Sequence, residues 1–145
     1  MSGHHNFDHA ADEGNLWLRK LEETLPFERS GQSLAALRAT LHVLRDRLTP
    51  EMAAHLSAQL PLVIRGLFFE GWKISRTPSA DDDIEVFCEH IADQLPPNFP
   101  FDPRTVAAAV FDVMWTELDV GETAKIIDFL PHALRFLWPV IARRA

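Results

Sequence analysis

The sequence has little of what builds disulfide-linked, zinc-bound or membrane-embedded folds. Its single cysteine, Cys88, excludes an internal disulfide framework and a four-cysteine zinc site. The most apolar runs, 60–64 and 106–111, end at charges and fall far short of the roughly 18 residues that suggest a membrane span. The first residues contain neither a basic stretch nor an apolar core, so we expect no signal peptide and a cytoplasmic location.

Motifs of known chemistry are also missing. The sequence has no His-Glu-x-x-His, no Gly-x-Ser-x-Gly, no phosphate loop and no Rossmann fingerprint. His4, His5 and His9 lie near the start without a carboxylate-histidine pattern, so we expect no metal site, and we expect no cofactor or catalytic residue. The net charge of -7 makes nonspecific nucleic-acid binding unfavourable. With 145 residues, 47% of them apolar, the chain can fold around one core unaided.

What the sequence does contain is helical periodicity. Apolar residues recur every three or four positions over 7–25 and 34–48, as they do on one face of a helix. Ser33 is a suitable N-cap for the second helix, and Thr49 followed by Pro50 begins a third. No stretch alternates with period two long enough to predict a strand.

The second part of the chain continues the pattern after a linker at 72–80. The three acids at 81–83 suit the first turn of a helix, and Asp102 caps the next one. That helix, 104–118, is apolar on nearly every side, so we expect it to be the most buried. Asp119 caps the helix that follows.

The sequence also repeats itself when it is shifted by 70 residues. The identical positions in the first part are Leu25, Pro26, Ala39, Val43, Leu48, Ala54, Leu60, Pro61, Arg65 and Leu67. Their counterparts are Leu95, Pro96, Ala109, Val113, Leu118, Ala124, Leu130, Pro131, Arg135 and Leu137. We expect one all-α domain over 1–145, made of two pseudo-symmetric helical halves, 7–71 and 81–139. Both Leu-Pro steps should break or kink their helices in the same way.

Three motifs in the first half are characteristic of a known family. They are Arg-Asp-Arg-Leu at 45–48, Gln-Leu-Pro at 59–61 and Arg-Gly-Leu-Phe-Phe-Glu-Gly-Trp at 65–72. With them the chain resembles, over about 7–139, the bacterial family called domain of unknown function 2267. The resemblance implies an all-α protein. It implies no activity, and no catalytic residue is carried over from it.

Basic side chains supply most of the candidate binding residues. Arg65 and Arg135 each follow a proline by four residues, and they are the only charged residues identical between the halves. We interpret them as caps for carbonyls that the proline leaves free, with a pair of anion sites as the alternative. Arg38, His42 and Arg45 form a basic stripe on one helix face. We interpret this stripe as solvated, with a docking surface for an acidic partner or a phosphate as the alternative.

His42 and His55 are nearly equidistant from the turn at 48–49. If the helices on either side run antiparallel, the two imidazoles lie within reach of each other, as do Asp112 and Lys125 in the second half. A shared hydrogen bond is the simpler interpretation, and a metal-binding or pH-sensing pair is the alternative.

Two tryptophans stand at unusual positions. Trp72 follows Gly71 just past an expected helix end, where an apolar cap is common. Trp115 takes an outer helix position, so it marks either the contact between the halves or a surface for a partner. Cys88 matches a core position and is expected to be an inert, buried thiol.

Together these features predict a non-catalytic helical interaction module that binds a protein or peptide through grooves between helices. The alternative is a small-ligand-binding protein or an enzyme with a pocket between the halves, using Arg65, Arg135 or His42 as polar groups. A large internal cavity favours the alternative, and a solid core with exposed Trp72 or Trp115 favours the module. We expect no nucleic acid and no membrane as partners, and the oligomeric state is open.

Overall fold

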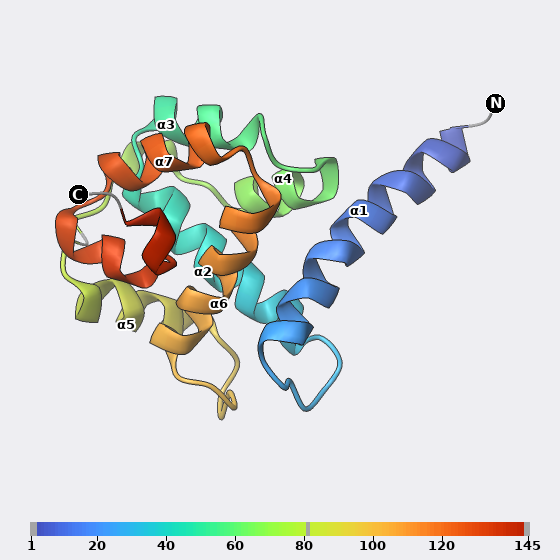
Figure 1. The fold of residues 1–145 in the computed structure, drawn as a ribbon, viewed down its shortest axis with the longest axis horizontal. Coiled ribbons are helices and arrows are strands. Elements are labelled where there is room, and N and C mark those ends of the chain that lie inside the picture. The colour runs from blue at the N-terminus through green and yellow to red at the C-terminus, as the bar shows by residue number, and fades with distance from the viewer. Residues whose placement is uncertain (1–2, 81, 144–145) are drawn as a thin grey trace.

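The computed structural model describes residues 3–80 and 82–143, and within these ranges every regular element is a helix (Figure 1). The elements are α1 (Gly3–Thr24), α2 (Gln32–Arg47), α3 (Pro50–Ser57), α4 (Leu62–Phe69), η1 (Ile74–Arg76), α5 (Ile84–Gln94), α6 (Pro103–Glu117), α7 (Val120–Phe129), η2 (His132–Leu137) and η3 (Val140–Ala142), where η denotes a 3-10 helix. The all-α class is confirmed. Asp81 and the side chain of His4 lie outside the described residues.

Side-chain caps set most of the helix starts. Thr49, Asp83, Asp102 and Asp119 each stand at an N-cap, and each accepts a hydrogen bond from a backbone N–H of the following turn. Such bonds satisfy donors that have no partner inside the helix. The sequence predicted Thr49, Asp102 and Asp119 as caps, whereas Asp83, expected in the first turn, is itself the N-cap of α5.

The start of α2 differs from the prediction. Its N-cap is Gly31, whose φ of 88° is the left-handed conformation that glycine tolerates without strain. Ser33 lies inside the helix, and its hydroxyl donates to the carboxylate of Glu22 on α1 at 2.6 Å. The side chain expected to cap α2 therefore joins α2 to α1.

Both proline steps end one helix and begin another. α3 ends at Ser57 and α4 begins after Pro61, while α7 ends at Phe129 and η2 begins after Pro131. Each proline is the N-cap residue of the element that follows. The predicted breaks are confirmed, although the second new element is a 3-10 helix and the first is an α-helix.

α2 forms the centre of the molecule, packed against α1, α4, α5 and α6, while α3 lies on α7 (Figure 1). Ten of the 16 residues of α2 are buried, against seven of the 15 in α6. The expectation that the 104–118 helix is the most buried is therefore wrong. The reason is that α4 covers the polar side of α2, whereas Ala108 and Asp112 of α6 remain exposed.

α1 extends away from the rest of the molecule at its N-terminal end (Figure 1). Its packed stripe consists of Ala10, Gly14, Trp17 and Leu21, all of which are buried. Phe7 continues the same stripe by one step and is 70% exposed. Among the described residues, no helix combines the length and the apolar character needed to cross a membrane.

Candidate functional site

The basic stripe of α2 holds the C-terminal end of α4. His42 Nε2 lies 2.8 Å from the carbonyl oxygen of Leu67, and Arg45 Nη1 donates to the carbonyls of Phe68 and Glu70 at 3.0 and 2.8 Å. The last carbonyls of a helix have no partner within it and carry the negative end of its dipole. Cationic and donor side chains therefore stabilise this helix end. The interpretation of the stripe as a solvated face is wrong for these two residues.

Burial controls the protonation of His42, which is only 8% exposed. Desolvation is the main cause that lowers the pKa of His42, and the charge of Arg45 lowers it further. The hydrogen bond with Leu67 and the charges of Glu70 and Asp46 oppose this shift. A carbonyl only accepts, so the neutral imidazole carries its proton on Nε2 and donates it to Leu67.

The arginines after the proline steps also bond to backbone carbonyls. Arg65 Nε donates to Ser57 at 2.9 Å and Nη2 donates to Leu60 at 3.1 Å. Arg135 Nη2 donates to the carbonyl of Asp128 at 3.0 Å. These are the contacts of the capping interpretation, in which each guanidinium binds carbonyls that the broken helix leaves free.

The predicted contact between His42 and His55 is wrong. His55 Nε2 bonds to the carboxylate of Glu122 on α7, far along the chain from the partner of His42. Lys125 pairs with Glu122 as well, at 3.3 Å, rather than with Asp112. The hydrogen bonds from His55 and Lys125 lower the pKa of Glu122. The prediction failed because α3 packs on α7 instead of returning along α2.

The two tryptophans are half-buried and pack against the core. The ring of Trp72 lies 5.0 Å from that of Phe69, so it covers the end of α4 as an apolar cap. Trp115 likewise contributes to packing rather than forming an exposed patch. Cys88 is 7% exposed, and burial raises the pKa of its thiol, consistent with an inert core residue.

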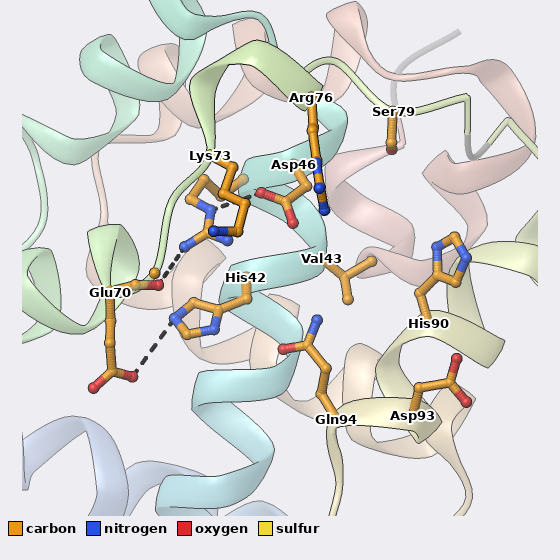
Figure 2. Close-up of a pocket in the computed structure, with 12 residues that line it drawn as sticks. His42, Val43, Asp46, Glu70, Lys73, Arg76, Ser79, His90, Asp93 and Gln94 are labelled. Atoms are coloured by element: carbon orange, nitrogen blue, oxygen red, sulfur yellow. Dashed lines mark hydrogen bonds and ion pairs between the residues drawn. The ribbon is translucent and has the colours of Figure 1, made fainter.

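A cleft of about 660 Å³ lies between α2 and α5, and we call it the cleft (Figure 2). His42 and Arg45 line it from α2, and residues 70–79 pass over it. This segment is attached to α2 at both ends, because Arg45 donates to the Glu70 carbonyl and the Ser79 N–H donates to Asp46 at 2.7 Å. The cleft therefore lies between the first and second parts of the chain.

Sequence reasoning missed the polar side chains that other elements contribute to the cleft. Lys73 and Arg76 extend from the 70–79 segment, and Asp93 and Gln94 come from α5 (Figure 2). The segment appeared only as a linker, because its residues show no periodicity. The positive φ of Gly71, 70°, marks the turn that directs the segment over the cleft.

A second hollow, which we call the groove, lies between α1, α2 and α4 and measures about 420 Å³. Most of its lining residues are apolar: Ala11, Leu18, Leu34, Leu37, Val63, Ile64 and Leu67. Arg38 and Glu70 also line it, and they form an ion pair of 2.9 Å. α1 approaches α4 closely at Gly14, where an added Cβ would lie 3.2 Å from Val63 Cγ1.

These features define an all-helical protein whose described surface includes a charged cleft and an apolar groove. The model of the family described as "Uncharacterized conserved protein (DUF2267)" matches residues 14–137. The chain therefore belongs to this family, as its motifs indicated. A comparison with curated proteins finds no match.

Proposed function

We propose that the protein is a non-catalytic helical interaction module, which binds a helical segment of another protein along the projecting part of α1 and the groove. The observation that carries this proposal is the 70% exposure of Phe7 at the end of an otherwise buried stripe. Burying one phenylalanine side chain contributes roughly 1.5–3 kcal/mol, so a partner that covers Phe7 gains up to about this much.

The position of Phe7 relative to the groove supports this proposal. Phe7 stands four residues, or about one helical turn, before Ala11, the first α1 residue that lines the groove. Leu62 and Val63 on α4 are also exposed, by 58% and 47%. An amphipathic helix that lies in an apolar groove uses anchors of this spacing, which is a recurrent mode of recognition.

We also propose that the chain is a single domain built of two related halves, 7–71 and 81–139, joined at 72–80. α3 begins at Pro50 and α7 begins at Val120, which is the offset of the sequence repeat. The contact of Arg65 Nη2 with the Ala58 carbonyl, at 3.4 Å, recurs at that offset between Arg135 and Asp128. Contacts of α2 with α5 and α6 join the two halves.

We also propose a cytoplasmic location. The lone buried cysteine supports a reducing compartment.

A selection from a phage library of amphipathic helical peptides tests the interaction module. Selected peptides should share apolar residues at helical spacing. They should bind Phe7→Asp at least about 30-fold more weakly, the loss typical of a central aromatic contact. Val140→Asp is the matched control, because Val140 is 76% exposed and lies at the opposite end of the chain. It should bind the peptides normally.

Two results would overturn the proposal. The first is a selection that enriches no helical pattern. The second is peptide binding that Phe7→Asp leaves unchanged. A third result would change the identity of the partner. If light scattering shows that the wild-type protein is a dimer and that Phe7→Asp is a monomer, the partner is a second copy of the chain.

A further inference from the structure

The cleft contains two cations that have no ion pair with any residue the structure describes. Lys73 and Arg76 belong to the 70–79 segment, and their side chains extend from it toward the cleft (Figure 2). The ends of this segment are bonded to consecutive α2 residues, Arg45 and Asp46. The fold therefore fixes the backbone that carries the two cations before any ligand arrives, which reduces part of the entropic cost of binding.

Three other ionisable side chains on this side of the cleft, Asp46, Glu70 and His42, already have partners. Asp46 accepts from Arg45 at 2.8 Å, and the Glu70 carboxylate accepts from Arg38 at 2.9 Å. His42 is held neutral by burial and donates to a backbone carbonyl. Lys73 and Arg76 are thus lining cations without an ion-pair partner in the described part of the chain.

The opposite wall of the cleft, on α5, restricts the ligand further. Asp93 lines the cleft, and its carboxylate makes no ion pair within the described part of the chain (Figure 2). An ionised carboxylate only accepts hydrogen bonds, so it repels a bare anion and attracts an ammonium or a hydroxyl group. Gln94 beside it both donates and accepts. A complementary ligand is therefore negative at one end and a donor at the other.

We infer that the cleft binds a small organic anion, with its phosphate or carboxylate between Lys73 and Arg76 and an amino or hydroxyl group donating to Asp93. The planar fork of an arginine fits two oxygens of either acid group, and lysine adds a point charge. The volume of about 660 Å³ lies within the range of pockets for small metabolites. The inference does not depend on the proposed interaction module, because the groove and Phe7 are formed by other elements.

The test adds each of four small probes to the full chain and measures the shifts of its backbone amide signals by NMR. Phosphoethanolamine carries a phosphate and an amine, and β-alanine carries a carboxylate and an amine. Ethyl phosphate lacks the amine, and ethanolamine lacks the acid group. The variants are Lys73→Met/Arg76→Met, which keeps the apolar stems, and Asp93→Asn. Arg19→Met, an exposed arginine on α1, is the matched control for loss of charge.

We expect saturable shifts in 73–79 and 93–94 with at least one of the two bifunctional probes. The stronger of these probes identifies the acid group as phosphate or carboxylate. The double variant should weaken its binding at least tenfold, about 1.4 kcal/mol or more. Asp93→Asn should weaken binding of the amine-bearing probes and leave ethyl phosphate unaffected or tighter.

The inference fails if neither bifunctional probe saturates the cleft amides at millimolar concentration. It also fails if Arg19→Met weakens binding as much as the double variant, because the effect is then one of overall charge. Phe7→Asp should bind the probes like the wild-type protein. The results on the cleft and on the interaction module can therefore be told apart.

Discussion

Replacing Arg45 with methionine tests whether the stripe on α2 holds the end of α4. Arg45 is 4% exposed, and its Nη1 donates to the Phe68 and Glu70 carbonyls at 3.0 and 2.8 Å. A hydrogen bond to a charged group contributes about 1.5–3 kcal/mol, and a buried acceptor left without a donor costs about 1–3 kcal/mol. Methionine retains much of the packing of the arginine stem but restores neither bond. We expect the free energy of unfolding to fall by about 3 kcal/mol.

The measurement is urea unfolding followed by far-UV circular dichroism, with thermal unfolding as a second readout. A loss of this size is a large part of the roughly 5–15 kcal/mol available to a domain. It corresponds to a fall in melting temperature of about 6–12 °C at this chain length. Arg45→Lys keeps the charge but not the planar guanidinium group, so its free energy of unfolding should lie between those of the wild-type protein and Arg45→Met.

Arg38→Met is the matched control, about two turns earlier on the same face of α2. Arg38 pairs with the Glu70 carboxylate at 2.9 Å, with the two side chains 42% and 55% exposed. Exposed pairs contribute about 0.2–1 kcal/mol, so this variant should change stability little. If Arg45→Met costs no more than Arg38→Met, the two carbonyl bonds do not stabilise the end of α4, and the reasoning is refuted.

The remaining predictions concern the core, the buried imidazole and the proline steps. Leu44→Ala should cost about 2–5 kcal/mol in urea unfolding, because Leu44 is fully buried, whereas Leu62→Ala, at a 58% exposed position, should cost little. The lowered pKa of His42 means that the unfolded state binds its proton first, so stability should fall as pH decreases below about 6.5 and level off below the folded-state pKa. His42→Gln should make this slope shallower. Arg65→Met should destabilise more than Arg135→Met, because Arg65 bonds three carbonyls and Arg135 bonds one.

Each of these predictions has an outcome that contradicts it. Equal midpoints for the two leucine variants would place Leu44 outside the core. An imidazole that titrates at or above the usual value in proton NMR would contradict the assigned effect of burial on the pKa of His42. Equal losses for the two arginine variants would mean that the carbonyl bonds do not account for their contribution.

Helix starts were predictable because the signal and the structure occupy the same few residues. Thr49 and Asp102 each bind an amide three residues away, so the pattern contains the whole interaction. The proline breaks were predictable for the same reason. The prediction that Ser33 caps α2 was wrong because its hydroxyl bonds to Glu22, which lies on another helix.

The candidate site was harder to predict because it forms between distant segments. Periodicity identified Arg38, His42 and Arg45 as one face of a helix, but it gave no information on what covers that face. The covering element is the carbonyl end of α4. Gly71 marked where that helix ends, but it gave no information on which helix that end packs against. The expected contact between His42 and His55 was wrong for a similar reason, because α3 packs on α7, which lies 70 residues further along the chain.

The close approach of α1 to α4 at Gly14 determines where the projecting helix points. Gly14 lies seven residues from Phe7, so the crossing acts as a pivot about 10 Å from the phenylalanine. A tilt of about 10° at this pivot displaces Phe7 by about 2 Å. This displacement is about half the distance of roughly 4 Å between heavy atoms of two side chains in contact. A larger residue at position 14 would meet Val63 in the groove and change the direction of the projecting part of α1, so it would move Phe7 without replacing it.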